Sequence, residues 1–199
     1  MMIKMYKFMI ITACLFLTCL PNQAKAAVYE IDGAHSQIGF AVKHLIVSKT
    51  RGAFSAYSGS VEYDPNDLST FHAQCSIDAN SIDTNNTGRD NHLKGTDFLD
   101  TASFPQITFQ GTQLTASSGS YQLTGDLTIR GITQKITLDV EISGPIASPF
   151  GGDVIGISGT AKINRQDFGV KWNKAMDTGG FVVDDIVELN IDIEGHKKP

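Results

Sequence analysis

The chain has 199 residues, with 21 Asp and Glu against 16 Lys and Arg, and a formal net charge of −5 at pH 7. It contains no run of basic residues, so this acidic balance argues against a protein that binds nucleic acid or an anionic membrane surface. The length suits a single domain, and no repeat, linker or low-complexity segment divides it.

The N-terminus has the three parts of a secretory signal peptide. Lys4 and Lys7 precede an apolar run over 8–20, and Ala24-Lys25-Ala26 supplies a small-residue cleavage site. The run is too short to cross the roughly 30 Å of bilayer hydrocarbon as a helix. We therefore expect residues 1–26 to be a signal peptide, cleaved after Ala26, and residues 27–199 to be one exported domain. Removal of three lysines with 1–26 leaves 13 basic against 21 acidic residues, a net charge of −8.

The three cysteines give no internal disulfide in that mature domain. Cys14 and Cys19 lie in the signal peptide, so Cys75 is left alone. Ile11-Thr12-Ala13-Cys14 also offers lipoprotein processing as an alternative, which the further apolar residues after Cys14 disfavour. The fold must then be stabilised by its core.

Apolar and polar residues alternate through most of the remaining chain, which is the pattern of half-buried strands. In chain order this pattern predicts strands over 28–31, 38–42, 54–63, 71–77, 106–110, 121–129, 132–142, 155–163 and 187–193. We expect the third of these strands to bend at Gly59. The strands of the C-terminal half follow one another without an intervening helix pattern, so we expect them to form an antiparallel meander.

The segment 121–142 predicts a hairpin with a defined register. Its apolar residues fall on odd positions up to Ile129 and on even positions from Ile132 onward. A two-residue turn at Arg130-Gly131 pairs 129 with 132, 123 with 138 and 121 with 140. This register keeps both apolar sets on one face, whereas a slip by one residue would separate them.

Eight or nine strands joined by short polar turns predict an all-β protein, either a closed antiparallel barrel or a sandwich. A barrel of about eight strands has an interior just wide enough for its side chains or for one slim ligand. Because the inward faces are apolar, a hollow interior would bind a hydrocarbon and a filled one would be an ordinary core. An outer-membrane barrel shares the alternation, but the single Trp and the short strands argue against stable membrane insertion.

The segment 83–104 interrupts the strand pattern and predicts a short helical insertion. Asp83 or Thr84 is the expected helix cap, and Arg89 and His92 would then share one side of the helix. One interpretation is a polar lid that meets a ligand head group at the barrel mouth. The alternative, which we favour, is a capped loop that satisfies its own hydrogen bonds. For Arg165 and Asp167 we likewise favour a role in fixing a turn.

Neither a metal site nor a catalytic group is predicted, and no cofactor is expected. Of the five histidines, His35 and His44 face opposite sides of an uninterrupted strand, and no H-x-x-x-H or C-x-x-C occurs. Cys75 is expected to point inward, where a thiol behaves as a small hydrophobe. The chain also lacks the G-x-S-x-G turn of many hydrolases, so we expect a protein that is not an enzyme.

Eight ordered motifs carry a resemblance that extends over the whole mature chain. They are Ile31-Asp32-Gly33-Ala34-His35-Ser36, Phe40-x-Val42-Lys43-His44, Arg51-Gly52-x-Phe54, Asn80-Ser81-Ile82-Asp83-Thr84, Arg89-Asp90-x-His92-Leu93, Phe104-Pro105-x-Ile107-Thr108-Phe109, 125–133 (GDLTIRGIT) and Asn164-Arg165-x-Asp167-Phe168-Gly169. This set resembles the YceI-like family of bacterial periplasmic proteins. The resemblance implies a lipocalin-like barrel with a long internal tunnel for polyisoprenoids, isoprenoid quinones or similar lipids, and roles in stress response.

We therefore expect the barrel interior to bind a long apolar ligand, for transport or for storage. The candidate ligand-binding residues are inward-facing apolar side chains, with Phe98, Phe104, Phe168 and Trp172 closing the ends: Ile38, Phe40, Val42, Phe54, Phe71, Phe98, Phe104, Ile107, Phe109, Leu127, Ile129, Leu138, Ile157, Phe168 and Trp172. A filled-core interaction domain and a lipid-modifying enzyme are the alternatives. Polar outward faces leave a homodimer open as a further alternative.

Overall fold

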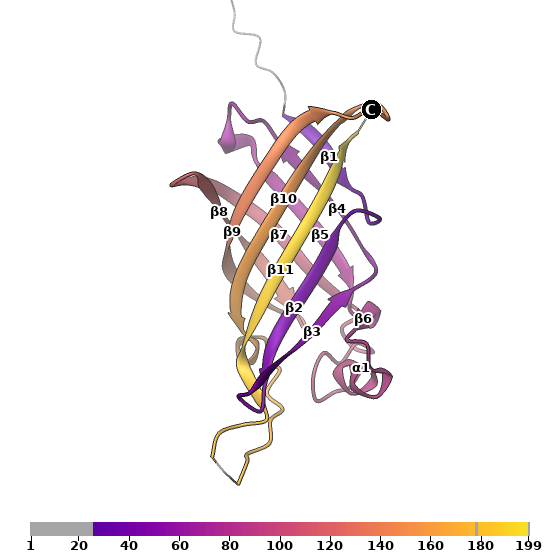
Figure 1. The fold of residues 1–199 in the computed structure, drawn as a ribbon, viewed down its shortest axis with the longest axis vertical. Coiled ribbons are helices and arrows are strands. Elements are labelled where there is room, and N and C mark those ends of the chain that lie inside the picture. Colours follow the sequence, from indigo (N-terminus) through magenta and orange to yellow (C-terminus); the bar gives the residue numbers. More distant parts are fainter. Residues whose placement is uncertain (1–25, 178, 199) are drawn as a thin grey trace, which may run out of the picture.

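A computed structural model describes residues 26–177 and 179–198 of the chain (Figure 1). The predicted signal peptide, residues 1–26, lies outside the described residues except for Ala26. The elements are β1 (Ala27–Ile31), β2 (Gln37–His44), β3 (Ser48–Phe54), β4 (Tyr57–Tyr63), η1 (Leu68–Thr70), β5 (His72–Asp78), η2 (Ala79–Ser81), β6 (Ile82–Asp83), α1 (Thr87–Lys94), β7 (Gln106–Ser117), β8 (Ser120–Ile129), β9 (Ile132–Ala147), β10 (Asp153–Asn164), η3 (Arg165–Phe168) and β11 (Val183–Lys197).

The strands form one sheet that closes on itself as an eight-stranded antiparallel barrel, as predicted. From β4 the order runs β5, β7, β8, β9, β10 and β11, and β1 joins β11 back to β4. Strand β11 pairs with β2 over 183–192 and with β1 over 195–197, so β1 and β2 share one position in the wall. Strands β3 and β4 share the next position, because β3 pairs with β2 and β4 with β1.

The predicted β8–β9 hairpin is confirmed in its register. Ile129 pairs with Ile132, Leu123 with Leu138 and Tyr121 with Val140. Arg130 and Gly131 have φ angles of 51° and 71°, which is the left-handed pair that a two-residue hairpin turn of type I′ requires. Local turn chemistry and the apolar pattern therefore specify the same pairing.

The predicted bend at Gly59 is wrong. The chain breaks at 55–56 instead, and Gly59 lies inside β4, paired with Cys75 of β5. A Cβ atom at Gly59 would clash with the backbone carbonyl of Gln74, so glycine is needed here for close approach of two strands. The break at 55–56 lets β3 leave β4 and pair with the two-residue strand β6.

The helical insertion is present as α1, but its predicted cap is wrong. Asn86 caps α1, because its side chain accepts a hydrogen bond from the Arg89 backbone N–H at 2.9 Å. Asp83 instead accepts from the Asn85 N–H, and Thr84 is buried. No helix among the described residues is long and apolar enough to cross a bilayer.

The two ends of the barrel differ. We call the mouth end the end that carries the β2–β3 turn (45–47), the insertion (84–105), the β8–β9 turn and the loop 169–182; it is the lower end in Figure 1. Tyr29, Tyr63 and Phe71 belong to the apolar cluster nearer the other end, which we call the far end. A second cluster, with Ile38 and Phe168, lies nearer the mouth end.

Candidate functional site: an apolar cavity in the barrel

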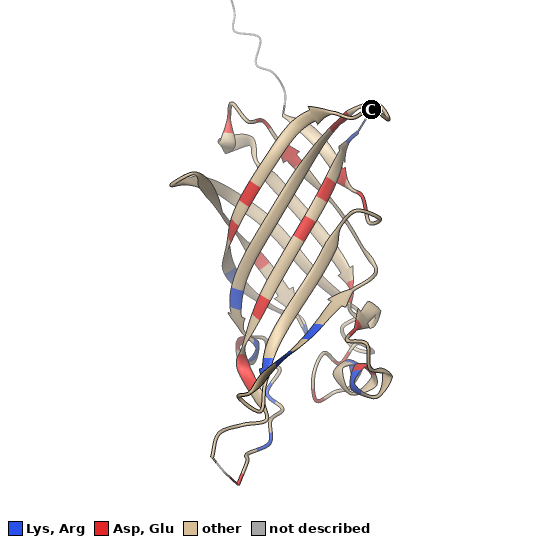
Figure 2. Ribbon diagram, in the orientation of Figure 1, with Lys and Arg blue, Asp and Glu red and all other residues tan. Residues whose placement is uncertain are grey.

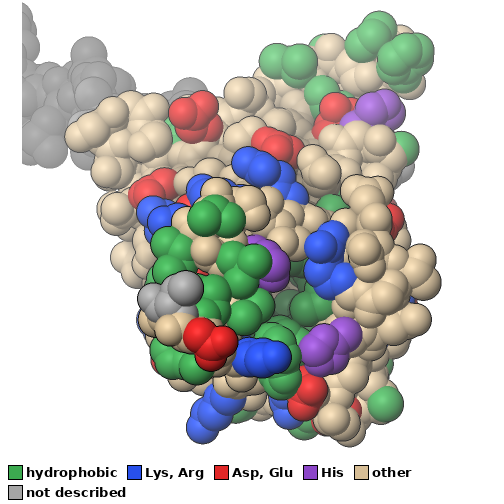
Figure 3. Space-filling model, turned by 60° about the horizontal axis from the view of Figure 1, so that its bottom comes forward, with side chains coloured by type: hydrophobic (Ala, Val, Ile, Leu, Met, Phe, Trp, Pro, Cys, Tyr) green, Lys and Arg blue, Asp and Glu red, His purple; other side chains and the backbone are tan. Residues whose placement is uncertain are grey.

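A cavity of about 260 Å³ lies between the walls of the barrel. Inward side chains from both apolar clusters line it, together with residues of the insertion and of β11. Its volume exceeds the roughly 150 Å³ at which a dry apolar cavity already binds benzene. The barrel interior is therefore hollow enough to hold an apolar ligand. Figure 3 looks onto the mouth end, where hydrophobic side chains surround a hollow.

The structure places 13 of the 15 predicted ligand-binding residues in the cavity lining, all except Phe104 and Trp172. Phe104 lies against the β8–β9 turn, where a Cβ on Gly131 would come within 2.9 Å of its ring. Trp172 packs on Phe98, with ring centres 5.2 Å apart, and it is Phe98 that lines the cavity. Both aromatic residues thus lie at the mouth end without lining the cavity.

Several lining residues were not among the predicted set. The inward face of β11, with Val187, Leu189, Ile191 and Ile193, borders the cavity and follows the same alternation that located its neighbours. Its pattern could therefore have identified these four positions. Leu93 and Leu99 of the insertion also line the cavity, but no periodicity in that segment points to them.

Aromatic side chains from two separate segments meet at the mouth end. His92 of α1 packs edge to face on Phe98 and on Trp172, with ring centres 4.9 and 5.2 Å apart. Phe98 is buried, whereas Trp172 is partly exposed. These contacts attach the insertion to the loop 169–182 and hold Phe98 over the cavity.

Hydrogen bonds inside the insertion satisfy its polar side chains, as favoured from the sequence. The Arg89 guanidinium donates to both the hydroxyl and the backbone carbonyl of Thr84, each at 2.7 Å. Asp90 accepts from the Thr84 hydroxyl and backbone N–H, and the bond from that hydroxyl holds the pKa of Asp90 below its usual value. The insertion therefore lines the cavity with Leu93, Phe98 and Leu99, while Arg89 and Asp90 form hydrogen bonds within the insertion.

Arg165 organises the loop at the mouth. The residue is buried, and its guanidinium donates to the carbonyl oxygens of Val170, Trp172 and Asp184 at 2.8–2.9 Å. A fourth bond reaches the carboxylate of Asp185 at 2.9 Å. Because these bonds occupy its guanidinium, Arg165 holds the backbone at 170–172 next to the start of β11, and the expected structural role is supported.

The cavity lining offers little for acid–base or nucleophilic chemistry. Among the described residues that line it, only Cys75 and Arg165 carry titratable side chains. Burial raises the pKa of the Cys75 thiol to about 11, so the group stays protonated and is a weak nucleophile at neutral pH. With Arg165 already bonded to four acceptors, what remains is an apolar surface suited to binding by burial.

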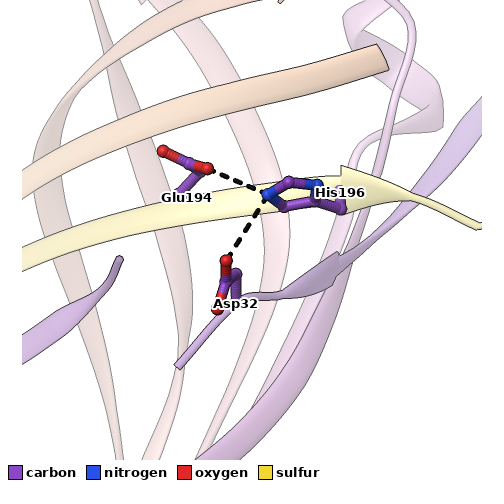
Figure 4. Close-up of side chains that lie close together, drawn as sticks. All are labelled: Asp32, Glu194 and His196. Atoms are coloured by element: carbon purple, nitrogen blue, oxygen red, sulfur yellow. Dashed lines mark hydrogen bonds and ion pairs between the residues drawn. The ribbon is translucent and has the colours of Figure 1, made fainter. Parts of the chain in front are cut away.

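Figure 4 shows a polar cluster where β1 bends into β2. The Nε2 atom of His196 lies 2.9 Å from a Glu194 oxygen and 3.5 Å from an Asp32 oxygen, and these three ligand atoms lie within 4.8 Å of one another. His35 adds an ion pair to Asp32 at 2.7 Å. Such a set could hold a cation, but each polar group already has a partner within it. We assign the cluster to stabilising the bend, since Asp32 also accepts from the Ala34 N–H.

Comparisons with known proteins agree on one family and one fold. The family model described as the YceI-like domain matches residues 29–195. A UPF0312 protein of Staphylococcus aureus is 42% identical over 167 residues, which cover 83% of this chain and 95% of the relative. The Campylobacter jejuni YceI protein has a crystal structure that is similar at a TM-score of 0.69 and 32% identity, over 79% of this chain and 90% of that one.

Two further solved structures share the fold. BcnA of Burkholderia cenocepacia superposes with a TM-score of 0.73 at 27% identity, over 82% of this chain and 98% of that one. A polyisoprenoid binding domain from Saccharophagus degradans superposes with a TM-score of 0.62 at 15% identity, over 87% and 100% of the two chains.

Proposed function

The chain belongs to the YceI-like family, and on that premise we propose that its barrel binds one long apolar ligand, such as a polyisoprenoid or isoprenoid quinone, for transport or storage in the periplasm. The observation that carries the proposal is the cavity of about 260 Å³ with its almost wholly apolar lining. A sugar, nucleotide or ion would find no free polar partner on that surface, whereas a hydrocarbon needs none.

Binding by burial accounts for affinity without polar contacts. Each methylene group moved from water into the cavity contributes roughly 0.8 kcal/mol, so a few isoprene units suffice for a tight complex. The lining residues come from strands on all sides of the barrel, so the ligand would lie along the barrel axis. A head group would then stay near the mouth end, where Figure 3 shows Lys, Arg and His side chains around the hollow.

The ligand class is supported by one structural neighbour. The Saccharophagus degradans domain carries polyisoprenoid binding in its description, and at 15% identity it shares the fold with this chain. We carry the polyisoprenoid over as a proposal because the cavity described above has an almost wholly apolar lining. Export is supported by residues 1–26, whose basic, apolar and small-residue parts have the order of a signal peptide, and the periplasm is the compartment that the resemblance to the YceI-like family implies.

A chain-length series tests the proposal. Titration of the protein with saturated fatty alcohols of increasing length should show an affinity that rises by up to about fourfold per methylene, until the cavity is filled. Diols of matched length serve as controls, and they should bind more weakly because one hydroxyl must be buried. An affinity that does not change with chain length would exclude burial in the cavity.

A further inference from the structure

The β2–β3 turn at the mouth end exposes three consecutive large apolar side chains. Leu45, Ile46 and Val47 are 40%, 67% and 84% exposed. The end of the loop that follows η3 lies beside them at Val182, because the Leu45 N–H donates to the Val182 carbonyl at 2.9 Å. In that loop Phe181 is 57% exposed. We call these four residues the apolar tip.

The backbone of the apolar tip is strained for the residues it carries. The Val47 N–H donates to the His44 carbonyl, and Leu45 and Ile46 have φ angles of 52° and 67°. These are the angles of a type I′ turn, which strongly favours Asn followed by Gly. A β-branched residue such as Ile46 is a genuine outlier in this region. The fold thus holds two apolar side chains in water, in a conformation that they disfavour, and such outliers cluster at functional sites.

Basic residues flank the 45–47 part of the apolar tip along the chain. Between Asp32 and Glu62 the sequence has no Asp or Glu but three cations, Lys43, Lys49 and Arg51. Lys49 is paired with Glu188 at 2.6 Å. Figure 2 shows that most Lys and Arg lie in the mouth half of the barrel, with a further basic segment near the C-terminus at the far end, whereas Asp and Glu occur along the wall and at both ends.

Lys43, Arg51, Lys171 and Lys174 are exposed and, within 26–177 and 179–198, form no ion pair. The acidic side chain in the same loop is Asp177, and Asp184 and Asp185 follow at the start of β11. Asp185 forms an ion pair with the buried Arg165. Although the whole chain has a net charge of −5, the two segments that carry the apolar tip thus hold four cations without an ion pair to any described residue, which we call the four free cations.

We propose that the apolar tip docks the barrel, mouth end first, on a bilayer surface that contains anionic lipids. Leu45, Ile46, Val47 and Phe181 would enter the boundary between head groups and acyl chains, and the four free cations would meet the phosphates. A narrow projecting tip suits the 5–10 Å depth of that boundary, whereas a stable protein partner needs roughly 800 Å² of matching surface. The docking needs no ligand in the cavity, so it goes beyond the function proposed above.

Vesicle flotation tests the docking. The protein should float with vesicles of equimolar phosphatidylcholine and phosphatidylglycerol, and much less with phosphatidylcholine alone. Leu45→Asn combined with Ile46→Gly supplies the residues that a type I′ turn prefers, so this variant should keep or raise thermal stability while losing flotation about tenfold. Lys43→Gln and Lys171→Gln should each weaken flotation about fivefold at low salt.

Phe150→Ser is the matched control. Phe150 is 96% exposed in the β9–β10 turn at the far end, and its loss should leave flotation unchanged. Equal loss in this control, or no flotation of the wild type with anionic vesicles, would overturn the proposal. A tip-dependent dimer in vesicle-free solution would do so too, since a second copy would then cover the tip. Protein from which organic solvent has removed any bound lipid should float equally well. Failure of the docking proposal can therefore be told apart from failure of the proposal that the cavity binds a lipid.

Discussion

The imidazole of His92 and the indole of Trp172 meet edge to face, with ring centres 5.2 Å apart and planes at 83°. One ring comes from the insertion and the other from the loop after η3, so the pair joins the two segments that border the mouth. Phe98 packs on both rings and faces the cavity. A movement of Phe98 should therefore change the packing around the Trp172 indole.

Trp172 is the only tryptophan of the chain, so its emission reports on the mouth alone. We predict that saturation with a long-chain alcohol shifts the emission maximum or intensity, because the ligand displaces Phe98 against the indole. Phe98→Leu should keep the lining apolar but reduce the change, since the aromatic contact is lost. Emission that stays constant while binding is seen by calorimetry would show that the ligand does not reach the mouth.

Arg130 anchors the insertion to the barrel, because its guanidinium donates to the carbonyl oxygens of Thr96 and Phe98. Arg130→Asn keeps a residue suited to the left-handed turn position but removes this reach. We expect a loss of about 1.5–3 kcal/mol of local stability, seen as faster hydrogen exchange over 87–104. Exchange across β8 and β9 should be unchanged, and general acceleration there would contradict a local role.

The ion pair of Asp32 and His35 should make a small, pH-dependent contribution to stability. Its hydrogen bond lowers the pKa of Asp32 from 3.8 and raises the pKa of His35 from 6.5. The contribution from Asp32 is present above pH 3.8 and is lost as the pH falls through its lowered pKa. That from His35 is present below pH 6.5 and is lost as the pH rises through its raised pKa.

The difference in unfolding free energy between the wild type and His35→Gln should therefore be largest between about pH 4 and 6.5. Urea titrations across the range from acid to weakly alkaline pH measure it. A difference that does not vary with pH would mean that His35 has a purely steric role at the bend.

Cys75 should react slowly with a charged thiol reagent in the folded protein. Burial raises its pKa to about 11, so the thiolate is scarce at pH 8, and the side chain faces the cavity. A saturating long-chain alcohol should slow the reaction further, because the ligand occupies the space next to the thiol. Protein unfolded in urea provides the reference rate, and an equal rate in folded protein would place the thiol outside the barrel.

Most strand positions and the β8–β9 register followed from the sequence because alternation and turn chemistry are local signals, but β3 was predicted only at its last residue and β6 was not predicted. Most of the thirteen predicted residues that line the cavity were found for the same reason, because alternate residues of a strand face opposite sides of the sheet. Phe98 and Phe168 lie outside the strands and were predicted as residues that close the ends. The break at 55–56 did not follow, because it depends on β6 pairing with β3 from a distant part of the chain.

The mouth was harder to predict than the barrel wall. Leu93 near the end of α1 and Leu99 in the following loop line the cavity, but the apolar residues of this segment show no periodicity that would predict it. The cap of α1 was misplaced because Asp83, Thr84 and Asn86 are all good capping residues, and hydrogen bonds formed only in the fold decide between them. The type I′ turn at Leu45-Ile46 was not predicted, because Leu and Ile are residues that such turns avoid.

Native mass spectrometry of wild type, Leu189→Trp and Asn190→Trp, purified from the native host, tests most directly whether the hollow barrel binds a long apolar chain. Leu189 faces the cavity and its neighbour Asn190 faces solvent, so the two variants add the same ring on opposite sides of β11. We predict a bound apolar mass on the wild type and on Asn190→Trp, released by organic solvent, and none on Leu189→Trp, with similar unfolding midpoints for all three. Wild type without any bound apolar mass, together with a loss of about 1–3 kcal/mol in Leu189→Trp, would reveal an overpacked solid core and contradict the account.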